Sequence, residues 1–418
     1  MTGRRIYLDN AATSFPKPDV VLRAMVDYSS DLGASPGRGS YTESQQSAQL
    51  LSRCRERLCE LFGGTSPEHV VFTLNCTDAL NLAIHGTVEW WQRHEPAESV
   101  HVVTTAMDHN SVLRPCSELL EQGVEVTRVG ADAEGLVDAG EVIASIRPTT
   151  RLVAMVHASN VTGTLQDVGA VGRICRERGV PLLVDAAQSL GHVPVDVEAL
   201  GIDLLAFPGH KGLMGPLGTG GLYIRPGLER RIEPVRQGGT GSRSEQDTQP
   251  SEMPDRYESG SHNTLGIAGL LAGVEWLLER SVAEVRAHEA GLIRTFLECF
   301  PGEDAGYRLH GPEDPAGRVG VFAVTHETVV PEELARQLET RAGVLCRSGL
   351  HCAPGAHEAM GTASTGGACR LSVGPMTTRD DVRAACACLA EIASESAAFG
   401  RKPRRQDERG SSIQPASV

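Results

Sequence analysis

The chain has 418 residues, of which 40% are apolar, so it is long enough for one large domain with a smaller one beside it. Its formal net charge of -14 excludes a basic surface for nucleic acid as the main function. No apolar run approaches the roughly 20 residues of a membrane span, and the opening MTGRRIYLDN lacks the apolar core of a signal peptide. We therefore expect a cytoplasmic protein that binds neither nucleic acid nor membranes.

Eleven cysteines are spread along the chain. Disulfide frameworks are typical of much shorter secreted proteins, so we expect reduced thiols that mostly occupy the core. Close pairs such as Cys54/Cys59 and Cys386/Cys388 lack the spacing of zinc ligands and are predicted to lie on helices. The sequence therefore predicts no metal site.

Residues 20–265 alternate short apolar runs with amphipathic stretches, which predicts a large α/β domain. Seven apolar runs predict strands at 69–73, 100–105, 124–130, 151–157, 181–187, 204–207 and 220–224. Helical patterns such as TDALNLAIHGTVEWW and VGAVGRICRERG separate several of these strands. We expect a mostly parallel seven-stranded sheet, whose ligands would collect at the carboxyl ends of the strands.

The rest of the chain, residues 1–19 and 266–399, predicts a smaller α+β domain. The polar, Gly- and Ser-rich residues 238–264 predict a long loop before it. Helical periodicity then follows in LGIAGLLAGVEWLLERSVAEVRAHEAGLIRTFLECF, with strand patterns in GRVGVFAVTH and CRLSVG and a last helix near 379–397. The tail, residues 400–418, is charged and nearly free of apolar residues, so we expect it to be disordered.

Polar side chains follow the ends of several predicted strands. They are Asn75–Asp78, His109, Asn160, Asp185 with Gln188, and His210 with Lys211. Because the carboxyl ends of parallel strands meet at one edge of the sheet, we expect these groups to converge there. Each alone has a simpler interpretation, since an aspartate at a strand end is usually a helix cap and a lone histidine is usually a core or surface group. Their conjunction favours a ligand site.

Lys211 lies in DLLAFPGHKGLMGPLGTGG, between an apolar run and a glycine-rich stretch. Burial there would keep its amine partly neutral, as a nucleophilic amine requires, whereas an arbitrary lysine would extend to solvent. Asp185 would hold a pyridinium nitrogen protonated, which is the role of an acid beside pyridoxal phosphate. A helix starting near Cys76–Thr77 would offer free N–H groups and a hydroxyl to the phosphate.

These residues belong to a series of motifs that resembles the class V aminotransferase family, and within it the cysteine desulfurases and the enzymes similar to selenocysteine lyase. The motifs run in the family's order from YLDNAATS (7–14) through NCTDALNLA, DHNS, ASNVTGT, VDAAQS and GHKG to RSGLHCAP and CRLSVG. The resemblance covers nearly all of the chain except the tail. It implies fold type I of the pyridoxal-phosphate-dependent transferases, with pyridoxal 5'-phosphate (PLP) as the cofactor.

The resemblance also implies a role for each residue. Lys211 would form the Schiff base with the cofactor, Asp185 would pair with the pyridine nitrogen, and His109 would stack on the ring and shuttle protons. The implied ligands of the ring oxygen, the substrate or the phosphate are Asn160, Gln188, Cys76, Thr77 and His210. The resemblance further implies a homodimer, in which Thr240 of GGTGS reaches the phosphate of the neighbouring subunit.

Two positions depart from the commonest pattern of the family. Pro208 stands where better-known desulfurases have a serine that binds the phosphate, so this hydroxyl is absent or is replaced by that of Thr240. The stretch ESGSHN, residues 258–263, stands where the family often has a Thr-Pro-Asn ending. The local turn, which includes Ser261 and His262, therefore lacks a rigid proline.

Cys352 in RSGLHCAP is the candidate sulfur acceptor. Its neighbours Arg347 and His351 would favour the thiolate, and the small-residue segment APGAHEAMGTASTGGA after it would let the thiol move. An arbitrary cysteine would be an inert core thiol, but the pattern Arg-x-Gly-x-His-Cys-Ala-x resembles that of one group of desulfurases. The resemblance implies that the Cys352 thiolate attacks the sulfur of cofactor-bound L-cysteine, which yields L-alanine and a persulfide on Cys352.

Arg370 of CRLSVG matches the family's arginine for the substrate carboxylate, and a guanidinium fork suits two carboxylate oxygens. Arg347 is a weaker candidate for the same role. A protein that accepts the persulfide sulfur is implied as a partner, but the sequence identifies neither this protein nor its pathway. It also leaves open the preference between L-cysteine and L-selenocysteine.

Other reactions of the class V family stay open: C–S lysis, selenocysteine lysis, epimerisation and transamination. Cys352 favours desulfuration, because simple β-elimination needs no thiol to accept sulfur, but it does not exclude a lyase. A non-catalytic protein on the same fold is disfavoured by the intact set of Lys211, Asp185, His109 and Arg370. The glycines of GPLGTGG lead into a strand instead of opening a helix, so they argue only weakly for a nicotinamide cofactor.

Overall fold

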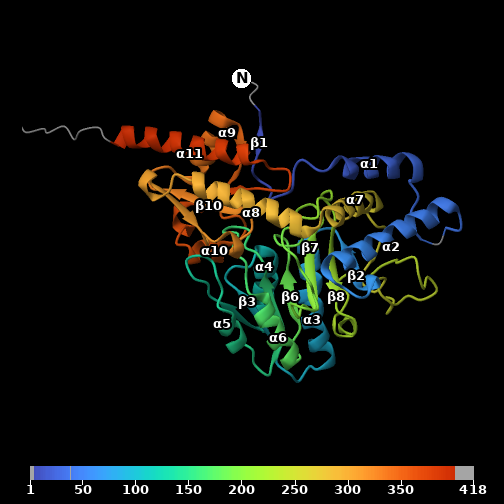
Figure 1. The fold of residues 1–418 in the computed structure, drawn as a ribbon. Helices are drawn as coiled ribbons and strands as arrows, with labels where there is room; N and C mark the ends of the chain where they lie inside the picture. The colour runs from blue at the N-terminus through green and yellow to red at the C-terminus, as the bar shows by residue number, and fades with distance from the viewer. Residues whose placement is uncertain (1–3, 38, 401–418) are drawn as a thin grey trace, which may run out of the picture.

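The computed structural model describes residues 4–37 and 39–400 of the chain (Figure 1). Of the tail that is expected to be disordered, residues 401–418 lie outside this part. Within the described residues, no helix is both long enough and apolar enough to cross a membrane.

A seven-stranded sheet forms the centre of the molecule, and its strands match the seven predicted positions. They are β2 (Val70–Thr73), β3 (His101–Thr105), β4 (Glu125–Val129), β5 (Thr150–Val156), β6 (Leu182–Asp185), β7 (Leu204–Pro208) and β8 (Gly220–Ile224). Their order is β2-β8-β7-β6-β5-β3-β4. The neighbours from β7 to β4 pair in parallel, whereas β8 runs antiparallel to both β7 and β2. The predicted mostly parallel sheet is confirmed.

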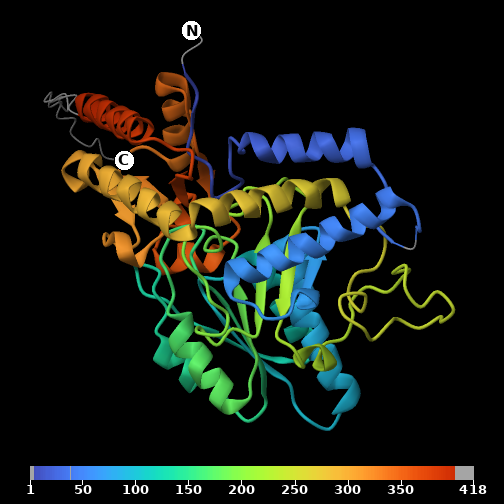
Figure 2. The same cartoon turned by 45° about the vertical axis from the view of Figure 1, so that its right-hand side comes forward.

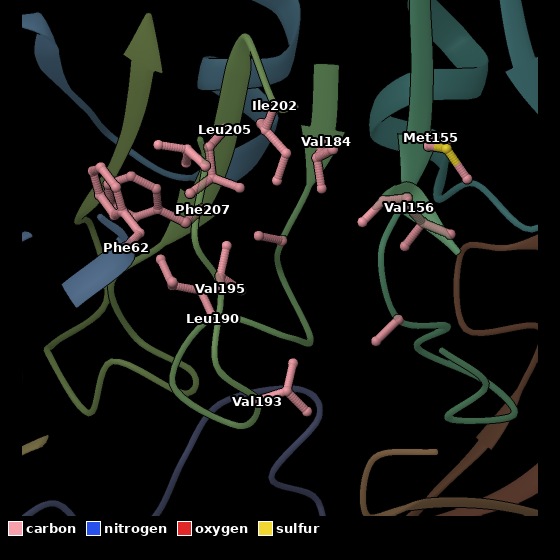
Figure 3. Packing of buried hydrophobic residues seen from close by; sticks show 14 of the residues in the cluster. Phe62, Met155, Val156, Val184, Leu190, Val193, Val195, Ile202, Leu205 and Phe207 are labelled. Carbon is pink, nitrogen blue, oxygen red and sulfur yellow. The ribbon is translucent and has the colours of Figure 1, made fainter. Parts of the chain in front are cut away.

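Helices cover both faces of this sheet, which explains why its central strands are mostly apolar. Every residue of β3, β6, β7 and β8 is buried. One face packs against α3 (Cys76–His94) and α4 (Asn110–Glu121). The other face packs against α2 (Thr42–Phe62), α5 (Ala139–Ala144), α6 (Val168–Arg178) and α7 (Thr264–Arg280). Figure 3 shows Phe62 of α2 against Phe207 of β7 on this second face, with 6.1 Å between the ring centroids.

A second sheet lies in the C-terminal part of the chain and has a hydrophobic core of its own. Its antiparallel strands are β9 (Tyr307–His310), β10 (Val321–His326), β12 (Arg347–Gly349) and β13 (Ala368–Ser372), in the order β12-β13-β10-β9. The associated helices are α8 (Val282–Cys299), α9 (Pro331–Ala342) and α11 (Arg379–Gly400). Helix α10 (Pro354–Ala359) follows β12 in the chain, but its buried Ala356 belongs to the core of the large sheet. The N-terminal strand β1 (Ile6–Tyr7) joins this part by pairing in parallel with β11 (Val344–Leu345).

The division of the chain near residue 265 stays a prediction. Helix α7 begins at this point, and its buried residues Ile267, Leu270 and Val274 belong to the core of the large sheet. It lies beside α1 (Asp19–Asp27) and α2, and α8 continues from it toward the small sheet (Figures 1 and 2). These contacts favour grouping α7 with the large sheet.

The predicted long loop is confirmed, because residues 238–263, all of them described, form neither helix nor strand. Part of the loop projects from the body of the molecule (Figure 2). Its C-terminal part is anchored by Glu258, whose carboxylate accepts two hydrogen bonds of 2.7 Å from Arg55 of α2. The same carboxylate accepts the N–H of Phe72 at 2.6 Å, and it lies 2.5 Å from His262 Nε2.

Candidate active site

A cleft with an empty volume of about 520 Å³ lies at the carboxyl ends of the parallel strands. Its lining comes from the segments that follow β2, β3, β5, β6 and β7. The structure brings together here Cys76, Thr77, His109, Asn160, Asp185, Gln188, His210 and Lys211. Eight of the residues chosen from the sequence thus share one cleft.

Lys211 lies in the turn that follows β7. A Cβ on the next residue, Gly212, would lie 2.2 Å from the carbonyl oxygen of Leu190, so only glycine fits there. Burial lowers the pKa of Lys211 below its ordinary value, while the nearby carboxylate of Asp185 opposes the shift. The turn therefore holds an amine that loses its proton more readily than a lysine in water.

Asp185 ends β6 and is 3% exposed. Its Oδ1 accepts the N–H of Ala187 at 2.9 Å, and the thiol of Cys76 donates to the same atom at 3.5 Å. Burial raises the pKa of Cys76 well above its usual range, and the charge of Asp185 raises it further. Cys76 therefore remains a neutral thiol that helps to orient the carboxylate.

His109 is the N-cap of α4, and its Nδ1 accepts the N–H of Ser111 at 3.1 Å. Burial lowers the pKa of His109, so the ring is neutral with its hydrogen on Nε2. The hydroxyl of Ser111 lies 2.8 Å from His109 Nδ1 and 2.7 Å from Thr77 Oγ1. Ser111 lines the cleft but has no role in the sequence-based site, although the DHNS motif contained it.

The N-terminal segment clamps the peptide group before Lys211, which the sequence did not predict. The carbonyl oxygen of His210 accepts Thr13 Oγ1 at 3.1 Å, Ser14 N at 3.1 Å, Ser14 Oγ at 3.2 Å and Lys17 Nζ at 2.8 Å. Ser14 Oγ also lies 2.9 Å from the carbonyl oxygen of Lys211. Burial lowers the pKa of Lys17 to about 8. The motif YLDNAATS was visible, but nothing in it pointed to these partners.

Arg370 of β13 is 3% exposed and reaches toward the cleft residue Asn160. Its guanidinium donates to the carbonyl oxygen of Asn160 at 3.0 Å and to Asp9 Oδ1 at 3.0 Å. Arg347, directly opposite on β12, donates to Asp9 Oδ2 at 3.1 Å, but its side chain is 54% exposed. Asp9 thus orients both arginines, and sequence reasoning missed it.

Two of the residues predicted to bind the cofactor, Thr240 and Gln188, contact other groups of the protein. Thr240 does not line this cleft; its hydroxyl lies 2.9 Å from Ser242 Oγ in the long loop. Gln188 does line it, but its amide donates to the carbonyl oxygen of Ala11 at 2.8 Å. Pro208 lines the cleft at the end of β7 without offering a hydroxyl.

Cys352 is exposed and lies on a tight turn between β12 and α10, with a positive φ of 55°. Its carbonyl oxygen accepts the N–H of Asn110, next to His109, at 2.8 Å. The carbonyl oxygen of His351 accepts Asn160 Nδ2 at 2.7 Å. The backbone around the thiol is therefore fixed to two segments that line the cleft.

One expectation about this turn is wrong. Burial, together with the charge of Arg370, lowers the pKa of His351 to about 3, so the ring is a neutral neighbour of Cys352 instead of a cationic one. Its Nδ1 lies 3.3 Å from His357 Nε2. The segment after Cys352 begins with α10, where a Cβ on Gly355 would lie 2.4 Å from the carbonyl oxygen of Ala106. The expected movement of the thiol stays a prediction.

The fold and the cleft together define an α/β protein that holds a buried lysine and a buried carboxylate at the strand ends of a mostly parallel sheet. Residues 6–384 match the family model "Aminotransferase class-V", and the chain belongs to this family.

Two curated relatives carry the name cysteine desulfurase. A "Probable cysteine desulfurase" of Methanothermobacter thermautotrophicus is 35% identical over 390 residues, which are 93% of this chain and 94% of that protein. "Cysteine desulfurase IscS" of Neisseria meningitidis serogroup C / serotype 2a is 31% identical over 383 residues, 90% of this chain and 89% of that protein.

Solved structures of cysteine desulfurases have the same fold. The apo structure of the enzyme from Thermococcus onnurineus NA1 has a TM-score of 0.85 at 30% identity, over 94% of this chain and 95% of that chain. CsdA from Escherichia coli has a TM-score of 0.80 at 26% identity, again over 94% and 95%. The predicted fold type I is confirmed.

Proposed function

We propose that the protein is a PLP-dependent cysteine desulfurase that converts L-cysteine to L-alanine and takes the sulfur as a persulfide on Cys352. One observation carries the proposal: Lys211 and Asp185 share a cleft, and the turn that bears Cys352 is hydrogen-bonded to two segments lining it. Membership of the class V family and the names of the relatives support the same reaction.

The residues of the cleft fit the cofactor. His210 Nδ1 and Asn160 Oδ1 are buried polar atoms that find no hydrogen-bond partner in the described part of the chain. The first turn of α3, with the hydroxyl of Thr77, suits a phosphate, and Asp185 suits a pyridine nitrogen. When bound, PLP supplies an electron sink for the negative charge that develops at Cα of an amino acid.

Lys211 and His109 would transfer protons. The lowered pKa of Lys211 would help Nζ to accept the α-proton of the substrate and return it later. His109 is held with its hydrogen on Nε2, so it can donate from that atom. Arg370 would bind the substrate carboxylate, since its buried Nε has no partner among the described residues. Arg347 would support it through the shared Asp9.

Cys352 would accept the sulfur. Its thiolate attacks the substrate sulfur, so the C–S bond of the substrate breaks, an S–S bond forms on Cys352, and the β-carbon takes a proton to become the methyl group of alanine. The exposure of Cys352 suits delivery of the persulfide to an acceptor protein. Eleven free thiols suit a reducing compartment, and we place the enzyme in the cytoplasm.

We further propose a homodimer in which Thr240 completes the phosphate site of the partner subunit. Thr240 lies outside the cleft of its own chain, on the loop that projects from the molecule (Figure 2). Large apolar side chains are exposed on and near α1: Phe15 by 59%, Leu22 by 55% and Val26 by 63%. Such apolar side chains are typical of a surface that a second subunit covers.

The test is a product assay with L-cysteine and a reductant for the wild type, Cys352→Ala and the control Cys299→Ala, which alters another exposed thiol. We expect alanine and sulfide in equal amounts from the wild type and the control, and neither from Cys352→Ala. Pyruvate formation that is insensitive to Cys352→Ala would instead make the protein a C–S lyase. Supplying L-selenocysteine in the same assay would measure the preference between sulfur and selenium.

A further inference from the structure

Two cysteines away from the cleft lie close enough to react with each other. The sulfur atoms of Cys346 and Cys369 are 3.6 Å apart, and no other two cysteines of the described chain have their sulfurs within hydrogen-bonding distance. Cys369 lies on β13 directly opposite Ser348 of β12, and Cys346 precedes Ser348 by two residues. Because side chains alternate along a strand, the two thiols lie on one face of the sheet as diagonal neighbours.

The two thiols differ in their access to solvent. Cys369 is fully buried in the core of the small sheet, whereas Cys346 is half-buried at the break between β11 and β12 and packs against that core. A small oxidant can therefore reach Cys346, while Cys369 is shielded from it. This is the arrangement of an oxidisable thiol beside a resolving thiol.

The position of the pair connects it to the candidate site. Cys346 directly precedes Arg347, and Cys369 directly precedes Arg370, the two arginines that share Asp9. Strand β12 continues into the turn that carries Cys352. A covalent bond between these thiols would therefore join the two strands immediately before both arginines.

We propose that Cys346 and Cys369 form a reversible disulfide when hydrogen peroxide reaches Cys346. The sulfur of Cys346 attacks the peroxide, the O–O bond breaks, one water leaves and Cys346 becomes a sulfenic acid. The sulfur of Cys369 then attacks that sulfur, the S–O bond breaks, the S–S bond forms and a second water leaves. The two thiols lose two electrons and two protons, and the peroxide is reduced to water.

Bond formation requires the sulfurs to approach from 3.6 Å to about 2.05 Å. Because diagonal neighbours across a sheet lie near the upper limit of Cα separation for a disulfide, the approach takes rotation of both side chains and a shift of the backbone at Cys346, which lies between β11 and β12. A thiol reductant reverses the reaction by exchange. Among the described residues, the exposed thiols Cys299 and Cys352 have no cysteine sulfur within hydrogen-bonding distance, so we expect them to be oxidised without a cross-link. The disulfide does not depend on the proposed desulfurase activity.

The test is peptide mapping of the full-length protein after treatment with hydrogen peroxide and alkylation of the remaining thiols. Trypsin cuts after Arg341, Arg347 and Arg370, so Cys346 lies in the peptide 342–347 and Cys369 in the peptide 348–370. The second peptide also contains Cys352, so the map is made in a Cys352→Ala background. We expect the two peptides joined, two hydrogen atoms lighter than their sum, and separated again by dithiothreitol.

Matched variants in the same background identify the partners. Cys369→Ser should abolish the link and leave Cys346 to proceed to the sulfinic acid, whereas Cys299→Ser should leave the link unchanged. Finding Cys346 as a sulfinic acid or an unmodified thiol while Cys369 is present would overturn the proposal. If Cys352→Ala does not fold, the cross-linked peptides of the wild type are fragmented, which shows directly whether Cys346 is bonded to Cys352 or to Cys369. A bond between Cys346 and Cys352 would also overturn the proposal.

Discussion

Replacing Glu258 by glutamine is predicted to detach the long loop from the large sheet and to destabilise the protein. Glu258 is 6% exposed and its partner Arg55 is 7% exposed. Their two hydrogen bonds are 2.7 Å long, and the carboxylate also accepts the N–H of Phe72 at 2.6 Å. Glutamine keeps the shape but removes the negative charge, so the Arg55 guanidinium stays buried without a counter-ion.

The expected loss follows from this burial. Breaking a buried ion pair from one side costs about 3–5 kcal/mol, and the amide oxygen of glutamine keeps one acceptor, so we expect about 3 kcal/mol in the free energy of unfolding. The measurement is urea unfolding at a fixed protein concentration. The double variant Arg55→Met/Glu258→Leu removes both charges and should recover most of the loss, because no charge is then left buried.

Glu252→Gln is the matched control, because Glu252 lies in the same loop and pairs with Arg243 at the surface, with side chains 50% and 49% exposed. It should change the free energy of unfolding by less than about 1 kcal/mol. The reasoning is refuted if Glu258→Gln unfolds within about 1 kcal/mol of the wild type, or if Glu252→Gln loses as much as Glu258→Gln.

Three further outcomes follow from the same structure. Burial would raise the pKa of Glu258, but Arg55 and His262 together outweigh burial, and the folded-state pKa lies below the ordinary 4.5. The free energy of unfolding of the wild type, measured with urea, should therefore exceed that of Glu258→Gln by its full amount above that pH. This difference should shrink as the pH falls through the lowered pKa. Gly355→Ala should lower the midpoint of thermal unfolding, because the new Cβ would lie 2.4 Å from a backbone atom. In Gly291→Ala the nearest atom to the new Cβ is the flexible end of a side chain at 3.4 Å, so this variant should leave the midpoint unchanged or raise it. His351, with a pKa of about 3, should show no shift of its ring resonances between about pH 6 and about pH 8, and a titration in that range would contradict its burial.

The large sheet was predictable because strands buried on both faces are mostly apolar, as β6, β7 and β8 are. The edge strand β4 is partly exposed and carries Glu125 and Arg128. The antiparallel direction of β8 was not predictable, because an apolar run does not show whether the neighbouring strand runs parallel to it. The cleft residues were predictable for a related reason: a polar residue directly after a parallel strand lies at the edge where such strands end.

The parts of the site that escaped prediction depend on partners that are distant in the sequence. Asp9 meets Arg370 across 361 positions, and Lys17 meets the carbonyl oxygen of His210 across 193 positions. No local pattern encodes such contacts. The error at His351 has the same origin, because its neutrality arises from burial beside Arg370 and His357, which composition around Cys352 does not show.

The contact between Asp9 and Arg370 has a consequence for biosynthesis. Residues 9–17 leave the ribosome early, but Arg370, the partner of Asp9, is added 361 residues later. At about 5–20 residues per second, the segment waits roughly 20–70 s for that partner. The hydrogen bond that joins β13 to the N-terminal segment can therefore form only after most of the chain has been synthesised.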